Sequence, residues 1–177
     1  MRDDQLTAPT PCAGATVAAL VDHVHGLAQA FTAAARKELG PMTDQPPEAS
    51  TGNLADDWRT DAPERLAALA QAWRDPDAWT GMTRAGGVDL PGNIAGLVAL
   101  DELVVHGWDL ATATGRPYTC DSAELAACTA FAESITAEQR DAGGLFGPAV
   151  PVRDGASALD RLVGLTGRDP AWAPARL

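Results

Sequence analysis

The sequence predicts an all-α protein, a four-helix bundle with a short additional C-terminal helix. Two observations predict this fold class. Four long segments have apolar residues three and four positions apart, the spacing that places them on one face of a helix. Loops rich in glycine and proline separate these segments, and the segments lack the strict alternation of apolar and polar residues that is typical of strands.

The first helix is expected to begin after Thr16, a suitable N-cap, and to end near Leu39, before the stop signal Gly40–Pro41. At 100° per residue, His23 lies at the edge of the apolar stripe and is positioned to face a core. His25 projects to roughly the opposite side and is expected to face solvent. The stripe itself consists of Val17, Leu20, Val24, Leu27 and Phe31.

A long loop over residues 41–59 should precede the second helix. Asp61 and Glu64 have the spacing of a capping box, so the helix is expected to begin near Asp61. It should end near Asp75. Residues 77–91 then form a second connection, in which the alternation of apolar and polar residues is too weak to predict a strand.

The third helix follows this connection and should end at Gly115, a residue suited to a left-handed C-cap. Pro117 prevents it from continuing. Asp121 and Glu124 again have capping-box spacing and predict the start of the fourth helix.

An irregular apolar segment over residues 143–152 is expected to lie over the bundle. A short last helix carrying Leu159 and Leu162 should end at Gly167, and residues 170–177 form a tail. The chain has no internal repeat and no linker of domain length, so residues 1–177 are expected to form a single domain.

The third helix carries a polar stripe among apolar residues. Glu102 and His106 are four positions apart and Asp109 is three further on, so all three project from one helix face. The other faces are apolar, which is typical of a buried helix. A buried carboxylate and imidazole need partners, and a metal ion would satisfy both. Two alternatives are an ordinary ion pair between Glu102 and His106 and a hydrogen-bonded histidine at His23.

Charge and cysteine content exclude several classes of protein. The net charge of −11 argues against binding nucleic acid or an anionic membrane surface. The three cysteines are far apart and form no CxxC pair, so a zinc ribbon or a disulfide framework is not indicated; they are expected to be small core or loop residues. No apolar run is long enough to span a membrane and no signal peptide is evident, which favours a cytoplasmic protein. The cysteines are Cys12, Cys120 and Cys128.

Two segments of the chain resemble the DinB-like superfamily: TPCAGATVAALVDHV over residues 10–24 and ELVVHGWDLATATG over residues 102–115. The branch most similar to them is the actinobacterial group related to the N-terminal domain of mycothiol-dependent maleylpyruvate isomerase. LFGPAVPV from Leu145 and LDRLVGLTGRDP from Leu159 are also similar to that branch.

The resemblance implies a DinB-like four-helix bundle that holds one divalent metal with His23, Glu102 and His106. Zn²⁺ suits two imidazoles and a carboxylate, as do Ni²⁺ and Fe²⁺. The family usually has tryptophan where this chain has Ala15, a change that could reshape the pocket mouth. The isomerase also has a C-terminal domain that this chain is too short to include, so its specific activity is not expected here.

The favoured interpretation of function is an enzyme in which the metal activates a low-molecular-weight thiol, mycothiol for this branch, as its thiolate. The partners would be that thiol and a small electrophile, and the outcome S-transfer or isomerisation. Asp109 could orient His106, although a helix-surface or capping role is the alternative. Superfamily members are often homodimers, but the sequence has no distinct interface signature. A non-catalytic metal- or ligand-binding protein, for sequestration or stress resistance, and a bundle whose metal site has decayed are the other hypotheses.

Overall fold

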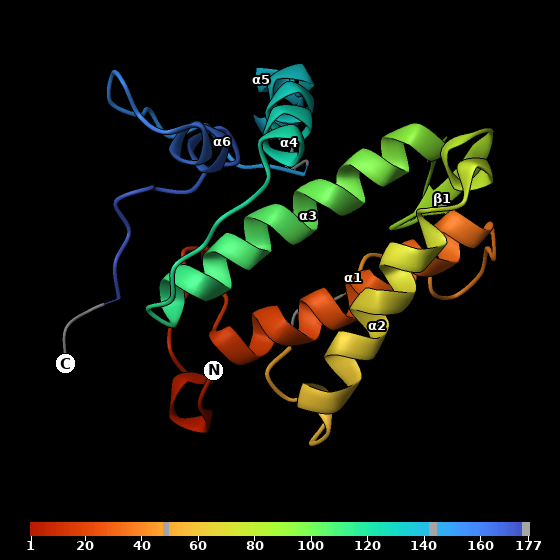
Figure 1. Cartoon of the computed structure of the whole chain (residues 1–177), viewed down its shortest axis with the longest axis horizontal. Coiled ribbons are helices and arrows are strands. Elements are labelled where there is room, and N and C mark those ends of the chain that lie inside the picture. The colour runs from red at the N-terminus through yellow and green to blue at the C-terminus, as the bar shows by residue number, and fades with distance from the viewer. Residues whose placement is uncertain (48–49, 142–144, 175–177) are drawn as a thin grey trace.

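Two long helices form the centre of the molecule in the computed structural model, which describes residues 1–47, 50–141 and 145–174. They are α1 (Val17–Arg36) and α3 (Gly92–Ala113), which pack side by side (Figure 1). α2 (Trp58–Ala72) packs against α1, whereas α4 (Ser122–Ser134) packs against α3 and α6 (Ala158–Leu165) against α4. This arrangement confirms the predicted all-α, DinB-like bundle with an additional C-terminal helix.

Short elements connect the main helices. The 3₁₀ turns η1 (Asp3–Gln5) and η2 (Pro76–Trp79) precede α1 and follow α2, and α5 (Ala137–Asp141) follows α4. α5 was not predicted. The irregular segment predicted over residues 143–152 is described only from residue 145, because 143 and 144 lie outside the described residues, as do residues 175–177 of the predicted tail.

The boundaries of α1 follow local chemistry. The side-chain oxygen of Thr16 accepts a hydrogen bond from the backbone N–H of Ala19 at 3.3 Å, as expected for an N-cap. The helix ends at Arg36 rather than near Leu39, because Lys37 adopts a left-handed conformation with a φ of 60°.

The predicted start of α2 was wrong. Asp57, not Asp61, precedes the first helical residue, so Asp61 and Glu64 form no capping box and Asp61 instead pairs with Arg65 one turn along. Trp58 packs against a buried cluster that contains Val17. This long-range contact stabilises an additional helical turn before Asp61. Local capping residues do not indicate such a contact.

Residues 77–91 contain an antiparallel hairpin that the sequence analysis did not predict. Strands β1 (Met82–Ala85) and β2 (Val88–Pro91) pair around the two-residue turn Gly86–Gly87, with φ values of 58° and 81°. Such positive φ angles favour glycine at both positions of a tight hairpin turn. The hydroxyl of Thr83 is buried and donates to the carbonyl of Ala34 on α1 at 2.6 Å. The strands are too short for a clear alternation, and packing on α1 stabilises them.

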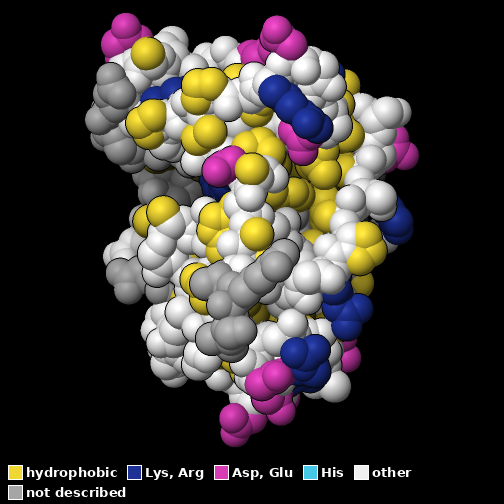
Figure 2. Space-filling model, turned by 90° about the vertical axis from the view of Figure 1, so that its left-hand side faces the viewer, with side chains coloured by type: hydrophobic (Ala, Val, Ile, Leu, Met, Phe, Trp, Pro, Cys, Tyr) yellow, Lys and Arg dark blue, Asp and Glu magenta, His cyan; other side chains and the backbone are white. Residues whose placement is uncertain are grey.

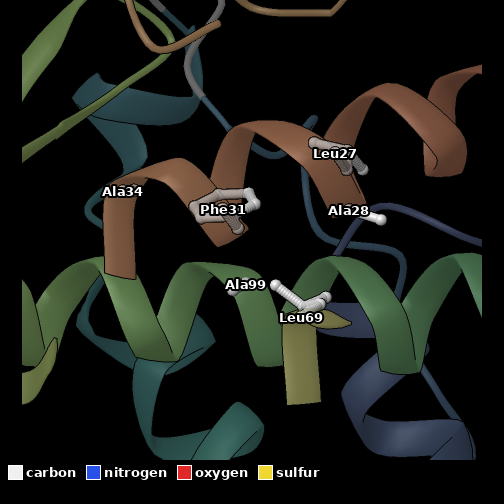
Figure 3. Close-up of a cluster of buried hydrophobic side chains, with 6 residues drawn as sticks. All are labelled: Leu27, Ala28, Phe31, Ala34, Leu69 and Ala99. Carbon is white, nitrogen blue, oxygen red and sulfur yellow. The ribbon is translucent and has the colours of Figure 1, made fainter. Parts of the chain in front are cut away.

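Small residues let α1 and α3 approach closely. Figure 3 shows a cluster in which Leu27, Ala28, Phe31 and Ala34 of α1 face Ala99 of α3, with Leu69 of α2 beside them. A second cluster joins α3, α4 and α6 through Val104, Cys128, Phe131 and Leu162. Together these clusters fix α3 between the two halves of the bundle, so its polar face is held against α1.

The surface carries the excess of acidic residues. On the face drawn in Figure 2, hydrophobic side chains gather over the middle and many aspartates and glutamates lie toward the two ends. Among the described helices, none is both long and apolar enough to cross a membrane.

Candidate metal centre

Three predicted residues meet where α1 faces α3. His23 comes from α1, and Glu102 and His106 come from successive turns of α3. Each offers one ligand atom, and these atoms lie within 4.8 Å of one another. His106 Nε2 is 2.9 Å from Glu102 Oε2, and His23 Nε2 is 3.9 Å from the same oxygen. The close packing of α1 on α3 therefore brings together residues that are far apart in the sequence.

Hydrogen bonds at Nδ1 fix the orientation of both imidazole rings. His23 Nδ1 lies 3.0 Å from the carbonyl oxygen of Pro47, and because a carbonyl only accepts, Nδ1 carries the proton. His106 Nδ1 lies 3.0 Å from Asp109 Oδ2. Both rings consequently turn Nε2 toward Glu102, and a neutral imidazole held this way presents a lone pair there.

The donor set fits a divalent first-row cation. A tetrahedral ion with ligands at about 2.1 Å would place neighbouring ligand atoms about 3.4 Å apart. The distances of 2.9 and 3.9 Å from Glu102 Oε2 lie on either side of that value. Small side-chain movements would therefore suffice to admit an ion.

Charge in the site is balanced by a proton when no cation is bound. Burial favours the neutral form of Glu102, but the close contact with His106, together with the nearby ring of His23, outweighs it and holds the pKa of Glu102 well below its usual range. Burial likewise lowers the pKa of His106, but hydrogen bonds to Asp109 and Glu102 outweigh it and raise that pKa above its usual value. The proton on His106 occupies the place where a cation would bind.

Asp109 is a buried partner of His106, and its alternative interpretation as a helix-surface residue was wrong. Its side chain is completely buried, and Oδ2 also accepts a hydrogen bond from Arg168 Nη2 at 3.2 Å. Arg168 follows α6 and was not predicted as a site residue. Nothing in its local spacing indicates the contact, because 59 positions separate it from Asp109.

A pocket of about 540 Å³ opens above the three predicted ligands. Residues before α1, on both central helices and around α6 line it, including Ala15, Phe146 and Arg168. This volume lies within the usual range for small-molecule sites. Ala15, where the family resemblance led us to expect tryptophan, is therefore part of the pocket wall.

Cys12 also lines the pocket, a position that the sequence analysis did not assign to it. Its sulfur belongs to a second compact group with His106 and Asp109. Burial raises the pKa of the Cys12 thiol, although Arg168 opposes the shift. Because the thiol form is favoured and an arginine stands beside it, this second group is a poorer cation site than the first.

Asp101 is another buried acid on the pocket wall. Its side chain is 1% exposed, and Oδ1 has no hydrogen-bond partner among the residues that the structure describes. Burial, together with the neighbouring carboxylate of Glu102, raises the pKa of Asp101 to about 7.

His25 is not solvent-facing as predicted. Its side chain is only 12% exposed, and Nδ1 lies 3.9 Å from Asp61 Oδ2 on α2. The helix periodicity correctly predicted that His25 points away from α3, but α2 covers that side of α1. His25 does not line the pocket.

Comparison with known proteins identifies one family. Residues 1–111 match the family model described as the mycothiol maleylpyruvate isomerase N-terminal domain, a stretch that contains His23, Glu102, His106 and Asp109. Two uncharacterized proteins of Mycobacterium tuberculosis, one from strain CDC 1551 / Oshkosh and one from strain H37Rv, are each 27% identical over 170 residues. Each alignment covers 95% of this chain and 87% of the relative. No solved structure matches the chain significantly.

Proposed function

The chain belongs to the mycothiol maleylpyruvate isomerase N-terminal domain family, and from that premise we propose that His23, Glu102 and His106 hold one divalent metal. We further propose that the site activates a low-molecular-weight thiol, mycothiol in the first instance, toward an electrophilic small molecule. One observation carries the proposal: two imidazole Nε2 atoms and a carboxylate oxygen converge at a pocket of about 540 Å³.

The protein's own residues prepare the site before any ligand enters. Pro47 and Asp109 hold the two imidazole rings by Nδ1, so little reorganisation is needed to bind a cation. Three protein ligands leave at least one coordination position free, which is typical of catalytic rather than structural sites. A cation there would favour the thiolate form of a bound thiol, which is the nucleophilic form.

The chemistry that follows belongs to the bound molecules. In S-transfer, the thiol gives its proton to solvent water, a C–S bond forms as the bond from that carbon to the leaving group breaks, and the leaving group departs with its electron pair. In isomerisation, the sulfur adds to a double bond and leaves again after rotation about the resulting single bond. Zinc is our first choice of metal, with nickel and iron as alternatives that suit the same donors.

The first test is the metal content of protein purified without chelator or affinity tag, measured by elemental mass spectrometry. We expect about one equivalent of a divalent metal, lost in His106→Ala. His25→Ala is the matched control, because His25 is also a largely buried histidine of the bundle but lies outside the pocket. No metal in the wild type, and none taken up on titration, would leave Glu102 and His106 as a structural ion pair.

The second test separates catalysis from simple binding. The Co²⁺-loaded protein is titrated with mycothiol, followed by its absorption spectrum, and is then given a panel of electrophiles with product detection by mass spectrometry. Spectral change with multiple turnovers supports an enzyme. Stoichiometric capture without turnover would indicate the alternative, a sequestering protein on the same bundle.

A further inference from the structure

Asp101 is a buried carboxyl group in the pocket wall that the proposed metal site does not use. It precedes Glu102 in α3 but projects about 100° away from it around the helix. Its side chain is 1% exposed, and among the described residues Oδ1 finds no hydrogen-bond partner. Buried polar atoms without partners are rare in folded proteins, because burial costs such an atom its hydrogen bonds to water and no other hydrogen bond replaces them.

Neither of the nearby positive side chains forms a hydrogen bond with Asp101 Oδ1. Arg168 and His106 are close enough to act electrostatically on Asp101. Arg168 donates through Nη1 to the carbonyl of Thr166 at 2.8 Å and through Nη2 to Asp109 at 3.2 Å, and its buried Nε forms no hydrogen bond with Asp101 or with any other described residue. Both nitrogens of His106 are occupied by Asp109 and Glu102, at 3.0 and 2.9 Å. Because Asp101 lines the pocket, a molecule bound there can supply the missing partner.

We propose that Asp101 recognises a hydrogen-bond donor, N–H or O–H, on the thiol that binds in this pocket. The inference rests on the proposed function and narrows its ligand to a class: small thiols that carry an ammonium, amide or hydroxyl group near the sulfur. The pocket wall also includes Leu20, Val105 and Phe146, whose side chains offer a donor no acceptor. Asp101 would accordingly discriminate between thiols of equal size.

Three thiols of nearly equal size test this. Cysteamine, 2-mercaptoethanol and 1-propanethiol differ only in an ammonium, a hydroxyl or a methyl group at the end distant from sulfur. Each is titrated into Co²⁺-loaded wild type, Asp101→Leu and Asp101→Asn, and the dissociation constant is read from the absorption spectrum. The ratio of affinities for two thiols is compared between proteins, so differences in thiol acidity cancel.

We expect the preference for cysteamine over 1-propanethiol to be about tenfold stronger in wild type than in Asp101→Leu, because a hydrogen bond to a charged group is lost. The melting temperature of Asp101→Leu should stay equal or rise, because the substitution removes an unpartnered buried polar group. The control is Asp121→Ala, which removes an exposed N-cap of α4 outside the pocket. It should lower the melting temperature and leave the thiol preference unchanged.

An unchanged preference in both Asp101 variants would overturn the inference, and a fall in melting temperature with unchanged preference would assign Asp101 a structural role. If Asp101→Leu fails to fold or to bind cobalt, the thiol preference of Asp101→Asn is the measurement that tests the inference. A wild-type spectrum that responds to none of the thiols would defeat the proposed function and this inference with it. Failure of the inference alone leaves the spectral response intact.

Discussion

At the scale of single residues, His106 has the most constrained side chain of the candidate site. One nitrogen is bound to Asp109 and the other faces Glu102, and the side chain is 7% exposed. Two carboxylates around one imidazole stabilise its protonated form more than burial destabilises it. A metal must therefore displace a proton from His106 to bind.

This displacement predicts an unusual pH dependence of metal affinity. The pKa of His106 in the metal-free protein lies above the usual 6.5, so the ring is still protonated at neutral pH. Affinity for Zn²⁺ should accordingly keep rising as the pH increases above about 7.5, where a histidine site with the ordinary pKa has levelled off. Competition with a chromophoric chelator from pH 6 to 9 measures this. An affinity that is flat above about pH 7.5 would contradict it.

A second residue-scale prediction concerns Asp109. Asp109→Asn should weaken zinc affinity about 10- to 100-fold, because the amide supports the His106 ring less well than a carboxylate does. Asp89→Asn is the control, since Asp89 is an exposed carboxylate that binds Arg84 in the hairpin at 2.7 Å. Chelator competition on both variants is the measurement, and equal affinities would show that Asp109 does not support the ligand.

At the scale of elements, α3 combines apolar packing on most of its surface with one polar face. Its N-terminal half packs against the loop that follows α2, where Trp73 and Trp79 meet at a ring-centroid distance of 5.1 Å. Gly96 lies against both indoles: a Cβ atom there would stand 2.6 Å from Trp79 and 2.9 Å from Trp73. This contact fixes how α3 lies in the bundle.

Gly96→Ala should destabilise the protein by about 1–3 kcal/mol, despite the higher helix propensity of alanine, because the added methyl group overpacks the indole pair. Gly147→Ala is the matched control. A Cβ atom at Gly147 would meet no heavy atom within 4 Å, so little change is expected. Urea unfolding of both variants gives the comparison, and equal stabilities would show that the tryptophans shift freely.

Across the whole molecule, a residue beyond the part of the chain that matches the family model contacts the candidate site. The family match ends at residue 111, whereas Arg168 lies after α6 and binds Asp109. The chain thus links its C-terminal segment to His106 through Arg168 and Asp109. Burial of Leu162 and Val163 anchors α6 and so places Arg168.

We therefore expect Arg168→Met to weaken zinc binding and to lower the melting temperature, because Asp109 would stay buried without its guanidinium partner. Arg153→Met is the control: Arg153 is an exposed arginine of the same C-terminal region. Chelator competition and thermal unfolding are the readouts. Unchanged zinc affinity in Arg168→Met would show that the C-terminal segment stabilises the bundle without supporting the site.

Much of the fold could be predicted because its causes are local. Glu102, His106 and Asp109 share a face simply because they belong to one helix, and capping residues placed the starts of α1 and α4. The core-facing position of His23 followed from the same periodicity, and the family resemblance joined it to the other two. Their role as metal ligands stays a prediction.

Which distant segments meet could be seen only once the helices were packed together. Arg168 beside Asp109, Cys12 in the pocket and α2 over His25 all depend on how helices pack, and no local period encodes such contacts. The hairpin over residues 82–91 could not be predicted for the same reason. Its strands are too short to show an alternating pattern, and packing on α1 stabilises them. The helices and the polar face of α3 could be predicted from local residue patterns, because backbone geometry acts over a few residues. The pocket depends on tertiary packing. The free energy gained by burying apolar surface is the same whether the contacting segments are near or far apart in the sequence.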